Sequence, residues 1–275
     1  MPRLIDAHTH VPFPAYGDEA GEVAKRALDQ NIWLVNVGTN LKTSTEAVGF
    51  AEKYEEGVYA TIGLHPNNTS PGYHDKNELG DSDEKERGGE DFDYEAYKEL
   101  GKSDKVVAVG ECGLDYFRME GDTKRQQREA LISQIDLAKD LDIPLMIHCR
   151  DAFDDLIELL KEKRADLKSV APGINHFFTG SINNATELMD LGFYFSFGGV
   201  ITFSRDYDEV IRHIGLDRVL LETDAPYVAP EPHRGKRNEP LYIKHTAEKL
   251  AEILGKDYEE VASVTTDNAR RILGI

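Results

Sequence analysis

The sequence is poor in cysteine and has no long apolar run, and each shortage excludes a class of protein. Its two cysteines, Cys112 and Cys149, are too few for the disulfide framework of a small secreted domain, and we expect both to be small, buried and reduced. No run is apolar for long enough to span a bilayer. Arg3 and Asp6 interrupt the region where a signal peptide would lie. These features predict a cytoplasmic protein without a membrane segment.

Basic residues are also scarce relative to acidic ones. The chain has 32 Lys and Arg against 51 Asp and Glu, which gives a net charge of −19. We interpret this excess as a solubility device. It argues against a protein that holds nucleic acid through a broad basic face. It does not exclude a nucleic-acid enzyme whose phosphate contacts are local and carried by metal ions.

Short β-rich runs alternate with helical patterns along most of the chain. The predicted strands span 3–6, 32–37, 58–62, 105–109, 143–147, 170–174, 193–197 and 218–221, and several are continuously apolar, as in strands buried on both faces. The predicted helices span 19–30, 43–54, 123–141, 152–163, 181–191, 207–214, 240–254 and 257–273. Eight strands alternating with helices predict an α/β chain folded as one (β/α)8 TIM barrel, regular or distorted. A doubly wound sheet is the alternative, but no glycine-rich fingerprint follows the first strand.

Residues 67–93 interrupt this alternation. The stretch is rich in Gly, Asp, Glu, Ser and Lys and has almost no apolar residues. Such a composition predicts a solvated acidic loop inserted after the third strand, within a single domain that covers residues 1–275. We assign no chemistry to this insertion.

Polar side chains gather where the predicted strands end. His8 and His10 follow the first strand, and side chains two positions apart in extended backbone project from the same face. In a barrel of this kind the carboxyl ends of the strands form the active site. Five of the nine histidines lie at such ends, which favours a metal centre over a set of unrelated core residues: His8, His10, His65, His148 and His176.

Two carboxylates complete a predicted ligand set. It consists of His8, His10, Glu111, His148, His176 and Asp224. Imidazole and carboxylate without thiolate suit zinc, manganese or a similar divalent ion such as magnesium. Because these residues exceed the needs of one tetrahedral ion, we expect two ions, with a carboxylate bridging them. Asp224 is placed to hold a metal and to take a proton from water. Glu222, two positions earlier on the same predicted strand face, either orients a ligand or water or pairs with an arginine.

Short motifs in order along nearly the whole chain resemble the TatD family of metal-dependent deoxyribonucleases, which belongs to the amidohydrolase-like barrels. They are His8-x-His10, Gly63-Leu64-His65-Pro66, Gly110-Glu111-x-Gly113-Leu114-Asp115-Tyr116, His148-Cys149-Arg150-Asp151-Ala152, His176-x-Phe178-Thr179-Gly180, Glu222-Thr223-Asp224-Ala225-Pro226-Tyr227 and Arg237-Asn238-Glu239-Pro240.

The resemblance implies a distorted TIM barrel that hydrolyses phosphodiester bonds in DNA, with some members of the family trimming strands from the 3′ end. It also implies that His8, His10 and Asp224 hold one ion, that His148 and His176 hold the other, and that Glu111 contacts both. Two features depart from the family pattern. The loop after Pro66 is longer and more acidic, and Phe177 stands where many members have Cys.

A phosphodiester substrate requires cations near the metals. The candidates for substrate binding are His65, Arg118, Arg150 and Arg237, with Arg205, Arg234 and Lys236 as further cations on the same rim. Tyr116, Phe117 and Tyr227 are candidates for stacking on bases. A charged residue on a loop is more often merely solvated, and Arg150 could instead pair with Asp151 or Glu222.

The predicted activity is therefore metal-dependent hydrolysis of DNA, single-stranded or at 3′ ends. Asp224, Glu111 and Glu222 are the predicted catalytic residues. The same ligands would serve hydrolysis of an amide, lactone or aminoacyl ester, and that alternative gains if His65, Arg150 and the cations at 234–237 do not face the metals. A barrel that serves only as a scaffold is the third hypothesis, but a scaffold has no need for six convergent ligands.

Overall fold

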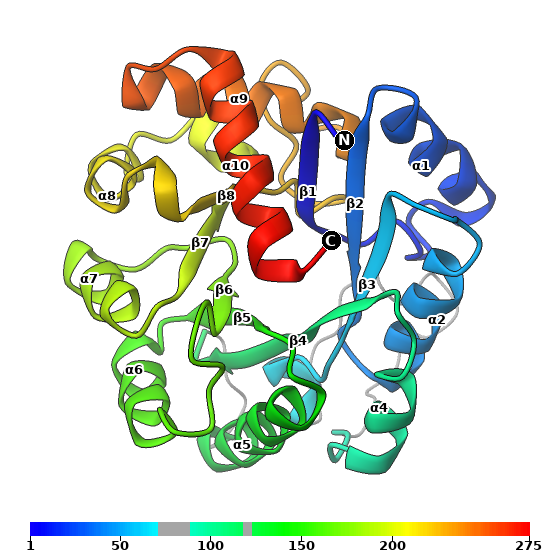
Figure 1. The fold of residues 1–275 in the computed structure, drawn as a ribbon, viewed down its shortest axis with the longest axis vertical. Helices are drawn as coiled ribbons and strands as arrows, with labels where there is room; N and C mark the ends of the chain where they lie inside the picture. Colours follow the sequence, from blue (N-terminus) through cyan, green and yellow to red (C-terminus); the bar gives the residue numbers. More distant parts are fainter. Residues whose placement is uncertain (71–88, 118–122) are drawn as a thin grey trace.

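The eight predicted strands are all present, and they form one parallel sheet in chain order. The computed structural model describes residues 1–70, 89–117 and 123–275, so residues 71–88 of the predicted insertion and Arg118 lie outside the described residues. The sheet curls into a barrel (Figure 1), which confirms the predicted (β/α)8 fold. Its strands are β1 (Leu4–Thr9), β2 (Ile32–Val37), β3 (Val58–Ile62), β4 (Val106–Asp115), β5 (Leu145–Arg150), β6 (Gly173–Asn175), β7 (Tyr194–Phe197) and β8 (Val219–Leu221).

Helices surround the sheet and cover its outer face (Figure 1). The sequence does not predict α4, because this short helix follows directly on the acidic stretch and buries only Tyr97 fully. The predicted helix at 240–254 begins with a 3-10 turn, Pro240–Tyr242, before α9. The described helices are α1 (Ala20–Leu28), α2 (Leu41–Ala51), α4 (Tyr94–Leu100), α5 (Lys124–Leu141), α6 (Phe153–Glu162), α7 (Ile182–Asp190), α8 (Asp208–Ile214), α9 (Ile243–Leu254) and α10 (Tyr258–Leu273).

Several strands differ from the prediction in where they begin or end, and β1 continues to Thr9 instead of ending at residue 6. β4 continues to Asp115 instead of ending at residue 109, and every residue in it is buried. The glycines of this segment are more typical of a loop than of a strand. In the structure, Gly113 lets β4 come close to β5, since a Cβ at this position would lie 1.8 Å from His148 O. β5 and β6 begin later than predicted, directly after Pro144 and Pro172, because proline has no N–H to donate to a sheet.

β1 and β8 close the barrel through the segments that follow them. Thr9 forms an isolated bridge with Ala225. The Asp224 N–H donates to His8 O at 2.9 Å, and the His10 N–H donates to Ala225 O at 2.8 Å. The seam of the barrel therefore joins the segment that carries His8 and His10 to the segment that carries Asp224.

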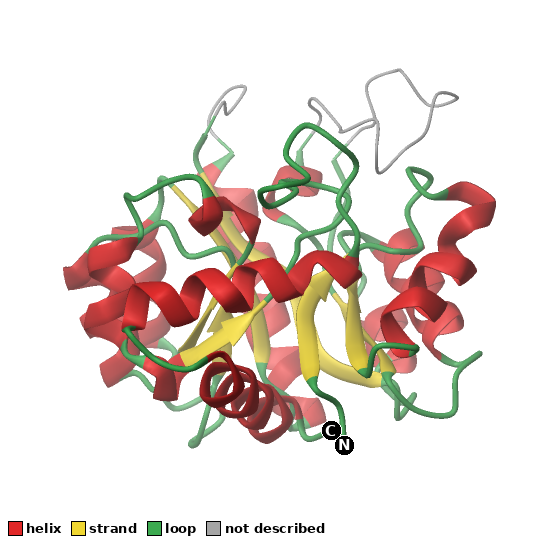
Figure 2. Ribbon diagram, turned by 90° about the horizontal axis from the view of Figure 1, so that it is seen from above, coloured by secondary structure: helices red, strands yellow, loops and turns green. Residues whose placement is uncertain are grey.

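The loops that follow the strands lie at one end of the barrel, and both termini lie at the other (Figure 2). α10 packs against β1 and β8. Its Thr266 Oγ1 donates to Arg3 O, just before β1 begins, at 3.2 Å. Among the described helices, none is both long and apolar enough to cross a bilayer.

Candidate metal centre

The predicted ligands converge at the carboxyl end of the barrel. Three overlapping groups of side chains have ligating atoms within 4.8 Å of one another: His8, His10 and Asp224; His8, Glu111 and His176; and His65, Glu111 and His148. All six predicted metal ligands belong to at least one group. His65, which we predicted to contact substrate, belongs to the third. Because His8 and Glu111 are each shared, the groups form one continuous centre.

His8, near the end of β1, and His10, just after it, point to the same place, as their spacing predicts. Their Nε2 atoms lie 3.2 Å apart. Asp224 Oδ1 lies 3.7 Å from His8 Nε2 and 3.5 Å from His10 Nε2. Both imidazoles are buried, whereas Asp224 is partly exposed. Asp224 is thus the ligand candidate of this group that solvent can reach.

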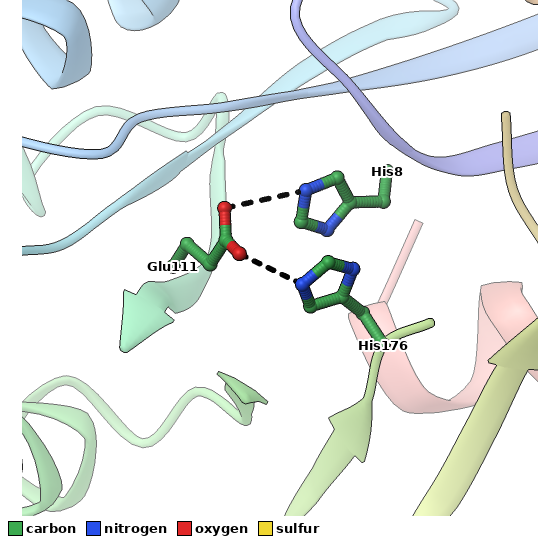
Figure 3. A group of neighbouring side chains, drawn as sticks. All are labelled: His8, Glu111 and His176. Carbon is green, nitrogen blue, oxygen red and sulfur yellow. Dashed lines mark hydrogen bonds and ion pairs between the residues drawn. The ribbon is translucent and has the colours of Figure 1, made fainter. Parts of the chain in front are cut away.

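Glu111 stands between the groups. Its Oε2 lies 3.5 Å from His8 Nε2, and its Oε1 lies 2.7 Å from His176 Nε2 (Figure 3). The same Oε1 is 3.0 Å from His148 Nδ1 and 3.4 Å from His65 Nε2. The rings of His8 and His176 stack with centroids 3.8 Å apart. One buried carboxylate therefore faces four imidazoles and belongs to two of the three groups that could hold a metal.

The pKa values in the centre reflect this crowding. Burial alone would raise the pKa of Glu111, but the imidazoles of His176, His65 and His8 hold it well below its usual range. Burial and the neighbouring His176 lower the pKa of His8 to about 4. Burial opposes protonation of His176 as well, yet Glu111 and Glu222 raise its pKa well above the usual value. The carboxylate of Glu111 is therefore ionised, and His8 stays neutral at pH 7.

The donor set fits a divalent metal ion. His10 Nδ1 lies 2.9 Å from Val37 O and must donate to it, so Nε2 of the neutral ring carries a lone pair. That lone pair faces His8 Nε2 and the carboxylate of Asp224. Such an arrangement of lone pairs is repulsive unless a proton or a cation lies between them. Imidazole and carboxylate donors without thiolate suit zinc or manganese.

The prediction that Glu222 and Asp224 share a strand face is wrong. β8 ends at Leu221, and Asp224 has a left-handed backbone with φ of 54°, so strand alternation does not apply. Asp224 turns toward β1, whereas Glu222 is fully buried beside His176. Glu222 Oε2 accepts from Ser196 Oγ at 2.5 Å and lies 3.7 Å from His176 Nδ1. Of the two readings that the sequence leaves open, this geometry favours orientation of a ligand histidine over a pair with an arginine.

Asp6 and Asn238 hold the segment that carries Asp224, and sequence reasoning assigned neither a role. Asp6 accepts hydrogen bonds from the Thr223 N–H at 2.9 Å and from Thr223 Oγ1 at 2.5 Å. Asn238 Nδ2 donates to Thr223 O at 2.8 Å and to Tyr227 O at 2.7 Å. Both are fully buried. The signal available in the sequence was the position of Asn238 in the late motif and of Asp6 just before the first histidine.

His65 differs from His10 in the hydrogen bond of its Nδ1, which accepts a hydrogen bond where that of His10 donates one. The Asn67 N–H donates to His65 Nδ1 at 3.1 Å, so the neutral ring carries its proton on Nε2. Burial lowers the pKa of His65 to about 3, so the ring stays neutral at pH 7. The Nε2–H therefore points toward Glu111 as a donor, and His65 has no lone pair there to offer a metal.

The predicted phosphate-binding arginines are only partly directed at the centre. Arg150 is exposed and stacks on Phe117, with its guanidinium carbon 3.4 Å from the ring centroid. Arg237 forms an ion pair with Glu19 and donates to Ala15 O at 2.9 Å. Arg237 therefore ties its own loop to the segment after β1, and a phosphate would have to displace Glu19.

Two further arginines and two aromatic residues of the predicted rim also have protein partners. Arg205 lies 3.8 Å from Asp208 and 3.5 Å from Glu252, and Arg234 lies over the Phe203 ring. Tyr116 donates to Asp155 at 2.7 Å. The Tyr227 ring meets the edge of His10, with centroids 6.1 Å apart. Tyr227 is thus the aromatic candidate that contacts a metal-ligand candidate directly.

Both cysteines are buried, free thiols, as predicted. Cys112 lies on β4 next to Glu111, and burial raises its pKa. Cys149 lies on β5 next to His148, and burial raises its pKa as well. Neither thiol belongs to the described groups that could hold a metal.

Comparison with known proteins agrees with this geometry. A family model described as TatD related DNase matches residues 5–274. The chain is 40% identical over 275 residues to the "Uncharacterized metal-dependent hydrolase YabD" of Bacillus subtilis (strain 168), with 99% of both chains covered. It is 31% identical over 280 residues to the "3'-5' ssDNA/RNA exonuclease TatD" of Klebsiella pneumoniae (strain 342), which covers 99% of this chain and 98% of that protein. The crystal structure of YJJV, a TatD homologue from Escherichia coli K12, superposes with a TM-score of 0.83 at 28% identity over 99% of this chain and 98% of that chain. The chain therefore belongs to the TatD-related DNase family of metal-dependent hydrolases.

Proposed function

We propose that the protein hydrolyses phosphodiester bonds of DNA with two divalent ions held around Glu111. The observation that carries the proposal is the continuity of the donor set, in which one buried carboxylate is shared by groups on both sides. A relative named as a 3'-5' ssDNA/RNA exonuclease supports the substrate class. The proposed ligands are His8, His10 and Asp224 for one ion and His148 and His176 for the other, with Glu111 common to both.

The residues of the centre have separate tasks in this proposal. When bound, a pair of divalent ions lowers the pKa of water and neutralises charge that develops on phosphoryl oxygens. Asp224 binds one ion and accepts the proton of the attacking water. We assign the proton to Asp224 and not to Glu111 because solvent reaches it more easily: its side chain is 17% exposed, whereas that of Glu111 is 6% exposed. Glu222 orients His176. When substrate binds, His65 exchanges its contact with Glu111, 3.4 Å away, for a hydrogen bond from Nε2–H to a phosphoryl oxygen.

The substrate contacts that we propose favour a strand whose bases are unpaired. The guanidinium of Arg150 covers Phe117 and offers N–H donors to a phosphate and a flat face to a base. Arg237 would have to exchange Glu19 for a phosphate, and Arg118 remains a candidate outside the described residues. The 3′ end of a single strand reaches such a site without melting a duplex. The free thiols of Cys112 and Cys149 fit the reducing cytoplasm that we expect as its compartment.

Cleavage of 3′-labelled single-stranded DNA by purified protein tests this proposal. We expect cleavage with manganese, magnesium or zinc, and none with EDTA. Asp224→Asn should lower the rate by about 10²–10⁴-fold, the usual contribution of a positioned acid or base. The exposed Asp190→Asn on α7 is the matched control and should retain full activity.

Two results would overturn the assignment in different ways. If the wild type binds two ions and leaves DNA intact, the centre stands and the substrate is wrong, and amides, lactones and aminoacyl esters become the next substrates to assay. If Asp224→Asn cleaves as fast as the wild type, the role of Asp224 is wrong. A protein that takes up no metal at all would favour the scaffold hypothesis.

A further inference from the structure

The carboxylate of Asp115 contacts the proposed metal ligand His148 on the side of the ring that faces away from the centre. Its Oδ2 lies 3.1 Å from His148 Nε2, and both groups belong to the ends of neighbouring strands, β4 and β5. The other ring nitrogen, His148 Nδ1, lies 3.0 Å from Glu111 Oε1 and 3.4 Å from His176 Nε2. His148 therefore presents Nδ1 to the centre and Nε2 to Asp115.

An ionised carboxylate accepts hydrogen bonds and donates none. His148 Nε2 must consequently carry a proton in order to bond Asp115, and Nδ1 is the ring nitrogen that remains for a metal. That is the nitrogen that faces Glu111. Hydrogen bonding at one ring nitrogen fixes which nitrogen can bind a metal, and such outer partners commonly raise metal affinity.

Asp115 is itself held in place from several sides. The Phe117 N–H donates to its Oδ1 at 2.8 Å, and Asn67 Nδ2 donates to its Oδ2 at 3.2 Å. Gln127 accepts from the Asp115 N–H at 2.8 Å and donates to its carbonyl oxygen at 2.9 Å. Asp115 is 2% exposed. The carboxylate therefore has little freedom to turn away from His148.

We propose that Asp115 is a positioning residue that fixes His148 as an Nδ1 ligand and, through its second oxygen, fixes the backbone of Phe117, on which Arg150 stacks. One carboxylate thus contacts both a metal ligand, His148, and the backbone of Phe117, whose stacked partner Arg150 is proposed to contact a base. The part concerning His148 rests on the proposed metal centre and is independent of the substrate. The part concerning Phe117 rests on the proposed function.

Asp115→Asn separates these roles because the amide has one oxygen and one NH2. The Phe117 N–H requires the oxygen on its side, so the NH2 turns toward His148 Nε2. Nε2 must then accept, and the proton moves to Nδ1, where it blocks the metal. Asn67→Ala is the matched control, since it removes the other bond to Oδ2 and leaves the bond to His148.

The test uses the full chain stripped of metal, with two readouts. Competition with a chelator measures zinc affinity, and we expect Asp115→Asn to weaken one ion by about 10–100-fold and Asn67→Ala to change it by less than about threefold. Ring ¹⁵N chemical shifts of the protein with zinc added, assigned with His148→Ala, report directly which ring nitrogen carries the proton. We expect Nε2–H in the wild type and Nδ1–H in Asp115→Asn.

An Nδ1–H tautomer of His148 in the wild type would overturn the proposal without any variant, so it remains testable if Asp115→Asn does not fold. Equal zinc affinities for a folded Asp115→Asn and the wild type would also overturn it. If zinc affinity falls as expected while the wild type leaves DNA intact, the positioning role holds and the proposed nuclease activity fails.

Discussion

At the residue scale, the centre depends on which nitrogen of each histidine carries the proton. His10 donates from Nδ1 to Val37 O and has Nε2 for a metal. His65 accepts from the Asn67 N–H and has an Nε2–H donor instead. Two histidines at similar strand ends therefore differ in what Nε2 offers: His10 has a lone pair for a metal, and His65 has an N–H donor. The difference arises because one ring meets a backbone carbonyl and the other a backbone N–H.

His65→Leu distinguishes a hydrogen-bond donor from a metal ligand. We expect the number of bound ions to stay the same, because His65 offers no lone pair to the centre. Loss of a donor to a phosphoryl oxygen should lower kcat/KM for single-stranded DNA by about 10²–10³-fold. Elemental analysis and cleavage kinetics measure the two quantities on the same sample. Loss of one ion from the variant would show that His65 is a ligand.

At the scale of secondary-structure elements, the ends of the strands determine the site, and the segments after β8 complete it. Asp224 reaches the histidines of β1 because its N–H bonds His8 O across the seam of the barrel. Asp6 anchors the neighbouring Thr223 from inside the barrel. The same seam is fastened at its other end by α10, which contacts the beginning of β1 and of β8.

Asn268 on α10 makes the bonds that attach this helix to the sheet. Its Nδ2 donates to Leu216 O and Val219 O, each at 2.9 Å, and the residue is 2% exposed. Asn268→Leu leaves both carbonyl groups without that donor, and we expect the free energy of unfolding to fall by about 2–4 kcal/mol. Urea unfolding in the presence of EDTA measures it.

The control for that measurement is Asn183→Leu, at an exposed position on α7. It should change the free energy of unfolding by less than about 0.5 kcal/mol. An Asn268→Leu variant as stable as this control would mean that the bonds between α10 and β8 do not stabilise the barrel.

Most of the candidate metal ligands could be predicted from the sequence because they lie at the ends of predicted strands. His8 and His10 could be placed on one face because extended backbone has a period of two, and the parallel barrel brings distant strand ends together. The bonds that orient ligands could not be predicted, since the contact of Asp115 with His148 depends on the register between β4 and β5. The direction of Asp224 was missed because its left-handed backbone breaks the alternation.

At the scale of the whole molecule, the proposed substrate is a polyanion, whereas the chain has a net charge of −19. The exposed ion pairs offer little help, since Arg237 is engaged by Glu19 and Arg205 by Asp208 and Glu252. In this account the attraction for phosphate is concentrated in the cations bound around Glu111. A protein of this design should have almost no affinity for DNA once its metals are removed.

Titration of the metal-free protein with manganese tests whether bound ions around Glu111 drive hydrolysis of DNA, with cleavage of 3′-labelled single-stranded DNA followed at each addition. We expect cleavage to be absent without metal, to rise with added manganese, and to level off at about two ions per chain, the number used in two-metal hydrolysis. Two bound ions with intact DNA, or cleavage that persists without metal, would contradict the account.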